Sequence, residues 1–290
     1  MSPRRIRSQT LRGSRRIASI GALVTVAATT AACGGSVAAT RGHPGTTRPH
    51  HGAISPGNNT KSGSSTTSTT LSTVSAVHPV NGKVTILEIG DSLGIDLGWG
   101  MQWALANDPH VNLVQDAKGD TGLANTGYFN WPAVLESELQ QVHPQIVVVF
   151  LGGNDPQGFY QGNQLVTYGT PLWRRAYGQR VATMMTEATS AGAQVLWVGM
   201  PIMQPRRFSH EMAMQDAVYR AQAATHAGVT YFSSWKLFAT PSGQYNGGTT
   251  DVAGSVMPLR DSDGIHLADG GEDLLGLDIV KKMQAIYKLP

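Results

Sequence analysis

The chain has 290 residues, of which 41% are hydrophobic, 7% aromatic and 14% charged, a length that suits one or two domains. This balance excludes a wholly disordered protein, and no run of 18 or more apolar residues predicts a membrane span. The formal charge of +3 depends on six arginines near the N-terminus. Without them the chain has 16 basic and 19 acidic side chains, so we expect no nucleic-acid partner.

The N-terminus has the features of an export signal. Residues 1–16 are rich in arginine and lack acids, and residues 17–32 form an apolar stretch that ends in small side chains. This order predicts a signal peptide over residues 1–32. The segment Ser14-Arg15-Arg16-Ile17 carries only part of a twin-arginine motif, so either export route remains open.

The only cysteine follows this signal directly. Thr30-Ala31-Ala32-Cys33-Gly34 resembles a bacterial lipobox, although Thr30 replaces the usual leucine. Cys33 is therefore our candidate for lipidation, which would anchor the exported chain to the cell membrane, facing the envelope. A cysteine that stands here by chance is the alternative. One cysteine excludes an intrachain disulfide and a zinc site made of thiolates.

A tether and one folded domain follow the signal. Residues 33–79 are dominated by Ser, Thr, Gly, Pro and His, including the run SGSSTTSTTLST at 62–73. Such a segment has too little apolar surface to offset its ordering entropy, so we predict a flexible tether. The folded domain is expected over residues 80–290.

Apolar runs and helix-length segments alternate along this domain, which predicts an α/β fold with a doubly wound parallel sheet. The candidate strands are Val84–Ile89, Val111–Ala117, Ile146–Leu151, Val195–Val198 and Val229–Phe232. The candidate helices are 95–107, 131–141, 172–191, 210–226 and 270–287. In such a sheet, ligands bind outside the carboxyl ends of the strands, so the residues that follow each strand are the most informative.

Four short motifs occupy these positions. They are Gly90-Asp91-Ser92-Leu93, Lys118-Gly119-Asp120-Thr121-Gly122-Leu123, Gly152-Gly153-Asn154-Asp155 and Asp263-Gly264-Ile265-His266. Each motif alone is a weak signal, because Ser92 could simply cap a helix and Asn154 could be a turn residue with positive φ. Their joint order along the chain is the strong signal.

In this order the sequence resembles the SGNH (GDSL-type) hydrolases, over roughly residues 83–287. More narrowly it resembles a bacterial branch long known as a domain of unknown function. The segments that suggest this branch are Tyr128-Phe129-Asn130-Trp131-Pro132, Trp173 with Tyr177, Trp197-Val198-Gly199-Met200-Pro201 and Leu259–His266. The resemblance implies a five-stranded parallel sheet between helices, of the flavodoxin-like kind.

The resemblance also implies a role for each motif. Ser92 would be the nucleophile, His266 the general base and Asp263 the carboxylate that orients it. This agrees with chemistry, since a serine hydroxyl needs an imidazole to take its proton and the imidazole needs a third group to fix its tautomer. Asp261 is a rival orienting acid, but it lies five residues before His266 and fits the motif less well. Asp91 is expected to hold the loop through backbone hydrogen bonds.

The oxyanion hole would be built from the Ser92 N–H, a glycine N–H and the Asn154 side chain. Gly119 and Gly122 are both candidates for the glycine, with a slight preference for Gly122. Four further residues, each with a core or rim role as the alternative, are candidates for lining the substrate pocket: Trp131, Gln157, Trp173 and Arg260. No histidines have a metal-ligand spacing with acids, so neither a metal nor a cofactor is expected.

These features predict an extracytoplasmic serine esterase. It would remove a small acyl group, most simply acetyl, from a cell-envelope glycan or a related small ester through an acyl-enzyme. Two alternatives remain open. An O-acyltransferase would use the same triad with a hydroxyl acceptor in place of water, and a catalytically silent glycan-binding lipoprotein would use only the scaffold.

Overall fold

The computed structural model describes residues 75–250 and 254–289. The predicted signal peptide, Cys33 and almost all of the predicted tether lie outside the described residues. The described chain contacts the folded domain from its first residue, since the Ser75 N–H donates to the Gln194 Oε1 at 3.2 Å and the Val77 N–H donates to the Tyr287 carbonyl at 3.0 Å.

The centre of the domain is a five-stranded sheet in the order β2-β1-β3-β6-β7, and every neighbouring pair is parallel. The strands are β1 (Val84–Gly90), β2 (Val111–Ala117), β3 (Ile146–Phe150), β6 (Gln194–Val198) and β7 (Val229–Phe232). All five residues of β3 and four of the five in β6 are buried. The continuous apolar runs therefore do mark strands covered on both faces, and the predicted doubly wound fold is confirmed.

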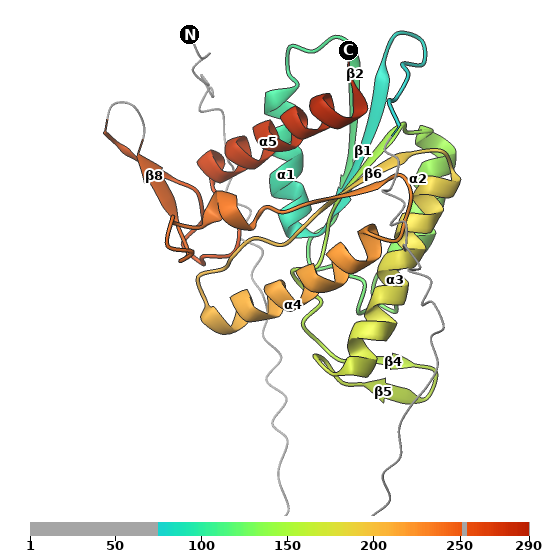
Figure 1. Ribbon diagram of the computed structural model, residues 1–290, viewed down its shortest axis with the longest axis vertical. Coiled ribbons are helices and arrows are strands. Elements are labelled where there is room, and N and C mark those ends of the chain that lie inside the picture. The colour runs from blue at the N-terminus through green and yellow to red at the C-terminus, as the bar shows by residue number, and fades with distance from the viewer. Residues whose placement is uncertain (1–74, 251–253, 290) are drawn as a thin grey trace, which may run out of the picture. The chain divides into compact units, whose positions relative to one another are not determined.

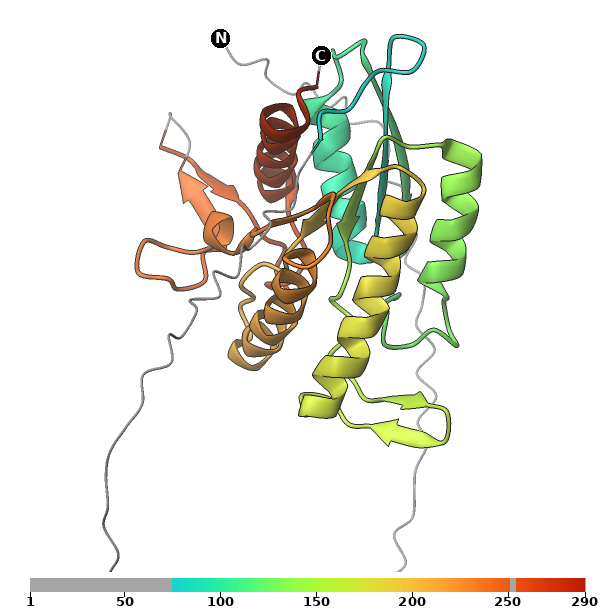
Figure 2. The same cartoon turned by 45° about the vertical axis from the view of Figure 1, so that its right-hand side comes forward.

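Helices cover both faces of this sheet (Figures 1 and 2). Helices α1 (Ser92–Ala104) and α5 (Asp269–Tyr287) pack against each other on one face. Helices α2 (Trp131–Val142), α3 (Pro171–Ser190) and α4 (Arg206–Ala223) form a row on the other. The chain leaves β1 toward one face and β3 toward the other, so the carboxyl ends of these two neighbours form the topological switch point.

Glycines let α1 and α5 approach until their backbones touch. A Cβ on Gly100 would lie 1.9 Å from the Glu272 carbonyl oxygen, and one on Gly276 would lie 2.2 Å from the Gly100 carbonyl carbon. Neither position therefore accepts a side chain. Because Ser92 begins α1 and His266 lies three residues before Asp269, where α5 begins, this close contact fixes the two halves of the candidate site relative to each other.

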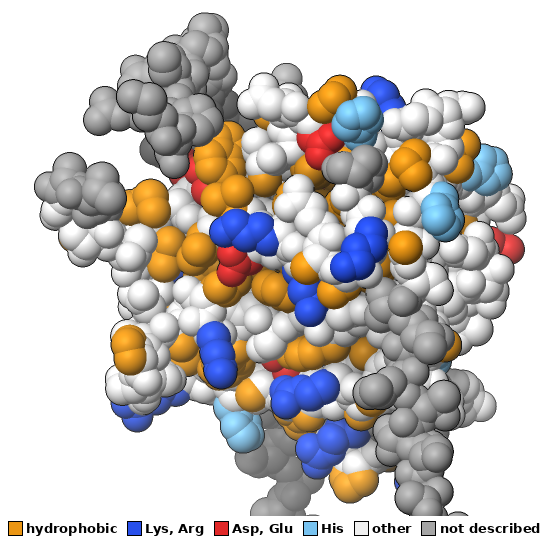
Figure 3. Space-filling view, turned by 45° about the horizontal axis from the view of Figure 1, so that its top comes forward, with side chains coloured by type: hydrophobic (Ala, Val, Ile, Leu, Met, Phe, Trp, Pro, Cys, Tyr) orange, Lys and Arg blue, Asp and Glu red, His pale blue; other side chains and the backbone are white. Residues whose placement is uncertain are grey.

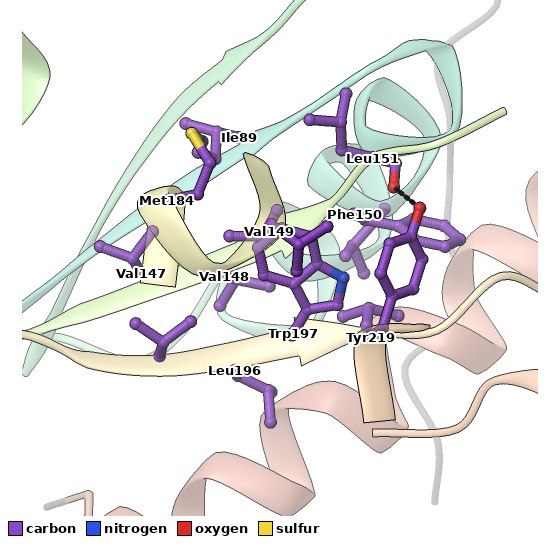
Figure 4. Packing of buried hydrophobic residues seen from close by; sticks show 14 of the residues in the cluster. Ile89, Val147, Val148, Val149, Phe150, Leu151, Met184, Leu196, Trp197 and Tyr219 are labelled. Atoms are coloured by element: carbon purple, nitrogen blue, oxygen red, sulfur yellow. Dashed lines mark hydrogen bonds between the residues drawn. The ribbon is translucent and has the colours of Figure 1, made fainter. Parts of the chain in front are cut away.

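The core between β3, β6 and the α3–α4 face contains large aromatic side chains. Trp197 on β6 lies beside Tyr219 of α4, with ring centroids 5.3 Å apart (Figure 4). The Tyr219 hydroxyl donates to the Leu151 carbonyl at 3.0 Å, at the point where β3 ends. This hydrogen bond satisfies a buried carbonyl and links α4 to the loop that carries Asn154.

One buried acid breaks the apolar pattern of β1. Glu88 has no exposed surface, and its two carboxyl oxygens have no hydrogen-bond partner among the described residues. Burial raises its pKa well above the usual value, and the nearby Asp116 and Asp91 raise it further. Gly94 and Gly98 of α1 pass directly above it, where added Cβ atoms would lie 3.1 and 3.0 Å from its oxygens. Burial beneath α1 therefore favours the neutral form of Glu88 over its carboxylate.

The boundaries of two predicted helices were wrong. α1 begins at Ser92 rather than residue 95, because the Asp91 side chain caps it by accepting from the Leu93 N–H. α4 spans Arg206–Ala223 rather than 210–226, because Pro205 at its N-cap has the fixed φ that lets a helix begin directly after it.

Four short strands and a 3-10 helix were not predicted. β4 (Phe159–Gln161) pairs with β5 (Gln164–Val166), and β8 (Gly248–Thr250) pairs with β9 (Val256–Pro258). The 3-10 helix η1 is Trp235–Phe238. Each of these strands has only three residues, too few to show an alternating pattern.

The described surface carries side chains of several chemical types. On the face drawn in Figure 3, Lys and Arg side chains are interspersed with hydrophobic and uncharged ones. Within residues 75–250 and 254–289, no helix combines the length and the apolar character needed to cross a membrane.

Candidate active site

Ser92, His266 and Asp263 come together at the carboxyl edge of the sheet. The Ser92 Oγ lies 2.9 Å from the His266 Nε2, and the His266 Nδ1 lies 2.6 Å from the Asp263 Oδ2. Ser92 follows β1 at the switch point, and the other two residues lie on the loop before α5. The order serine, imidazole, carboxylate is the one in which a base can take the hydroxyl proton while its tautomer is fixed.

Backbone hydrogen bonds hold the carboxylate in this position. The second oxygen of Asp263 accepts from the N–H groups of Ile265, at 2.7 Å, and His266, at 3.0 Å. The three-residue spacing between Asp263 and His266 thus closes a tight turn in which one carboxylate binds both the backbone and the ring. Among the described residues, no hydrogen bond joins the Asp261 side chain to the ring, and the Asp261 backbone N–H donates to the His266 carbonyl at 3.0 Å.

The environment shifts both ionisable groups of the pair. Partial burial alone would raise the pKa of Asp263, but hydrogen bonds from the His266 side chain and from two backbone N–H groups outweigh it and lower that pKa. Partial burial alone would lower the pKa of His266, but the hydrogen bond and charge of Asp263, with Asp96 and Asp91 farther away, raise it. Asp263 therefore stabilises the imidazolium that would form when His266 accepts a proton.

Asp91 holds the turn between β1 and α1, as the sequence predicted. Its Oδ1 accepts from the Leu93 N–H, and its Oδ2 accepts from the N–H groups of Gly152 and Gly153, at 2.9 and 2.7 Å. Asp91, and not Ser92, is thus the N-cap of α1, so Ser92 is free to face His266. A side chain at Gly152 is excluded because a Cβ there would lie 2.1 Å from the Tyr219 hydroxyl.

Asn154 reaches across to the loop after β2. Its Nδ2 donates to the Thr121 carbonyl at 2.9 Å, which leaves the second amide hydrogen for another acceptor. Asn154 does lie in a turn, but its φ is not among the positive values, so that part of the alternative interpretation is wrong. Thr121 shares its peptide bond with Gly122, so the Asn154 amide lies beside Gly122.

Gly122 and Gly119 differ in how tightly they are packed. A Cβ on Gly122 would lie 2.2 Å from the Asp155 Oδ1, whereas a Cβ on Gly119 would meet nothing within 4 Å. Only position 122 therefore requires glycine for steric reasons. This packing favours Gly122 over Gly119 as the oxyanion donor, a role that stays a prediction together with those of Ser92 and Asn154.

Sequence reasoning missed the carboxylate that shapes this loop. Asp155 is fully buried, and it accepts from the Leu123 N–H at 3.0 Å, the Ala124 N–H at 2.7 Å and the Tyr177 hydroxyl at 2.5 Å. Burial raises its pKa, an effect that these three donors oppose. Asp155 thus fixes the path of the chain around Gly122. Its place directly after Asn154 was the available signal.

A second missed acid joins α1 to the histidine loop. The Asp96 Oδ2 accepts from the Leu267 N–H at 2.8 Å. Burial raises the pKa of Asp96 to about 6, an effect that this hydrogen bond opposes. Asp96 lies four residues after Ser92, on the same face of α1, so this spacing was the signal for a helical residue beside the nucleophile.

The four candidate pocket residues have other positions. Trp131 and Trp173 have no exposed surface and belong to the core. Arg260 is also buried, and its guanidinium donates to the carbonyl oxygens of Ile202 and Ile265. Gln157 is exposed and donates to the Asn154 carbonyl at 2.6 Å. Only Gln157 is thus placed at a pocket rim, and the other three are structural.

No metal centre is formed by the described side chains. In residues 75–250 and 254–289, no group of three or more His, Cys, Asp or Glu side chains is arranged to hold a metal ion.

We expect Asn154→Ala to lower the turnover of an ester substrate by about 10²–10³-fold, because one preorganised oxyanion donor is lost. The lost interaction is made with the oxyanion of the transition state and not with the bound ester, so the Michaelis constant should change little. Steady-state kinetics on a chromogenic ester measure both constants, and Asn163→Ala, at the exposed β4–β5 turn, is the matched control. A loss below about threefold would contradict the oxyanion role.

Comparisons with known proteins identify the family and the fold. The model of the family described as "Protein of unknown function (DUF459)" matches residues 85–282. The chain is also similar in structure to a GDSL-like lipase from Bacteroides thetaiotaomicron, with 12% identity, coverage of 72% of this chain and 92% of the lipase, and a TM-score of 0.52. No curated protein matches the chain in sequence.

Two further solved structures are similar to the chain. One is the lipopolysaccharide acetyltransferase periplasmic domain of Salmonella ser. Paratyphi A, with 17% identity, coverage of 73% of this chain and 91% of that domain, and a TM-score of 0.51. The other is TesA, with 24% identity, coverage of 70% of this chain and 99% of TesA, and a TM-score of 0.49. The resemblance to the SGNH hydrolases is thus confirmed, and the chain belongs to the DUF459 family on the SGNH hydrolase fold.

Proposed function

We propose that this protein is a serine esterase of the SGNH type, which transfers the acyl group of a small ester to Ser92 and then to water. The observation that carries the proposal is the hydrogen-bonded series from Ser92 through His266 to Asp263. In the first step His266 takes the Ser92 proton while the Oγ attacks the ester carbonyl. His266 then gives that proton to the departing alcohol.

The second step regenerates the enzyme. Water, with His266 again as the base, attacks the acyl-enzyme and releases the carboxylic acid and the free Ser92 hydroxyl. In both steps the carbonyl oxygen becomes an oxyanion, which the N–H groups of Ser92 and Gly122 and the free hydrogen of the Asn154 amide would stabilise.

The substrate that we propose is an acetylated glycan of the cell envelope. The predicted signal peptide and Cys33 support a location outside the cytoplasm. If Cys33 is lipidated, Cys33→Ala should move the protein from the membrane fraction to the soluble fraction, as measured by immunoblotting of fractionated cells. Continued membrane association of the variant would refute the lipid anchor.

Hydrolysis of p-nitrophenyl esters by the purified protein tests the esterase directly. We expect turnover of the acetate, with slower turnover as the acyl chain lengthens. Preference for long chains would indicate a lipid substrate, and no turnover of any ester would refute the esterase.

Acyl transfer is the second candidate, because the acyl-enzyme is common to both reactions and the shared fold includes the periplasmic domain of an acetyltransferase. A sugar hydroxyl that accelerates release of the acyl group from Ser92 would favour transfer over hydrolysis.

A further inference from the structure

A cavity of about 370 Å³ lies next to the histidine loop, outside the catalytic residues themselves. Its walls come from the segment after β6, the first turns of α4 and the segment from η1 to β8, which Figure 1 shows around the N-terminal end of α4. Its volume falls within the range of roughly 300–1,000 Å³ in which proteins bind small ligands.

Hydrogen bonds join the wall of this cavity to the loop that carries the triad. The N–H of Gln204, a wall residue, donates to the Gly264 carbonyl at 3.1 Å. The buried Arg260 donates to the carbonyl oxygens of Ile202, in the wall, and Ile265, beside His266. Gly264 has a φ of 68°, and a Cβ there would lie 2.3 Å from the Gln204 Cβ. The cavity and His266 therefore belong to one rigid unit.

The reaction mechanism places the alcohol portion of the substrate on the His266 side of Ser92. The departing alcohol takes its proton from His266, so its oxygen must lie close to the imidazole. The rest of the alcohol can then extend along the histidine loop. A cavity whose wall is bonded to residues 264 and 265 is placed to receive it.

The lining of the cavity has the chemistry of a sugar site. Trp235 and Tyr245 are both half-buried, so part of each ring is open to a ligand. Gln204 and Gln244 bring amide groups that can donate to and accept from hydroxyls. A few polar groups beside aromatic surface are typical of sites that orient a polar ligand.

The charges of the lining favour an acidic sugar. Arg206 and His210 line the cavity, and no Asp or Glu is among the lining residues. No carboxylate of the described residues pairs with Arg206, whereas the adjacent Arg207 pairs with Glu211 at 3.0 Å on the helix surface. A guanidinium matches the geometry of a carboxylate through two parallel hydrogen bonds.

We propose that this cavity binds the alcohol portion of the substrate, a sugar ring that bears a carboxylate. The inference rests on the proposed esterase function and deepens it, because it names the charged class of glycan that the site takes.

Binding is measured by calorimetry on the purified protein with three pairs of probes: methyl glucuronide and methyl glucoside, methyl galacturonide and methyl galactoside, and N-acetylmuramic acid and N-acetylglucosamine. We expect the acidic member of at least one pair to bind about tenfold or more tightly than its neutral partner. Arg206→Ala should remove this preference, and Trp235→Ala should weaken both members of the pair. Arg207→Ala, the matched control, should leave the preference unchanged.

Equal binding within all three pairs, no binding of any probe, or a preference that survives Arg206→Ala would overturn the proposal. Hydrolysis of p-nitrophenyl acetate by the same preparation distinguishes failure of the cavity proposal from failure of the esterase proposal. Turnover without acidic-sugar binding removes the cavity proposal alone, and sugar binding without turnover removes the esterase alone.

Discussion

Replacement of Ser92 by alanine should abolish ester hydrolysis, with turnover reduced by about 10⁴- to 10⁶-fold, the range of losses seen when a serine nucleophile or its triad partner is removed. The physical reason is that no other group can form the acyl-enzyme beside His266. The fold should survive, because Asp91 rather than Ser92 caps α1 and alanine is the best helix former.

Two measurements check this result. Wild-type protein should hydrolyse p-nitrophenyl acetate and react with a fluorophosphonate, which labels activated serines, whereas Ser92→Ala should do neither. Ser137→Ala, on the exposed face of α2, is the control for loss of a serine. Labelling that persists in Ser92→Ala would place the nucleophile elsewhere.

His266→Ala should lower turnover by about as much as Ser92→Ala does. Turnover of the double variant should be only slightly lower than that of either single variant. Residues that act as one unit give losses that do not add. Additive losses would mean that His266 does not activate Ser92.

The strands and the motif positions were predictable because they depend on local pattern. Ile146–Phe150 forms a continuous apolar run, and such a run bounded by polar turns predicts a covered strand whatever its neighbours are. Once five parallel strands are recognised, the topology brings the residues that follow them to one edge of the sheet. The fold follows from that geometry, whereas the pairing of Ser92 with His266 was predicted from the resemblance to the SGNH hydrolases.

The missed residues depend on contacts between distant segments. Asp155 binds N–H groups of residues more than 30 positions away, and Asp96 binds one 171 positions away. The role of each acid depends on which backbone N–H groups lie opposite it. The hydrophobic pattern of the sequence does not predict those contacts. Arg260 was interpreted as a pocket residue for the same reason, since the carbonyls that accept hydrogen bonds from its guanidinium belong to two separate loops.

The Asp263→Asn variant should retain the loop but lose about 10⁴-fold in turnover. The asparagine oxygen can still accept from the Ile265 and His266 N–H groups, so the turn should persist. The amide cannot stabilise an imidazolium as a carboxylate does, and it can favour the wrong tautomer of His266. Asp261→Asn, two residues away and without a contact to the ring, should stay within about threefold of wild type and serves as the matched control.

The pH profile gives this variant a signature that a structural defect would not produce. His266 acts as a base only when neutral, so activity falls as the pH drops through its pKa. Asp263 raises that pKa, which places the acid limb of the wild-type profile above the usual histidine value of 6.5. Removing the carboxylate charge lowers the pKa, so the acid limb of the residual activity should move to lower pH in Asp263→Asn and not in Asp261→Asn. An unchanged limb in both variants would show that Asp263 does not interact with His266 during catalysis. The orienting acid would then have to be sought in Asp96 or Asp91, the two other carboxylates that raise the pKa of His266.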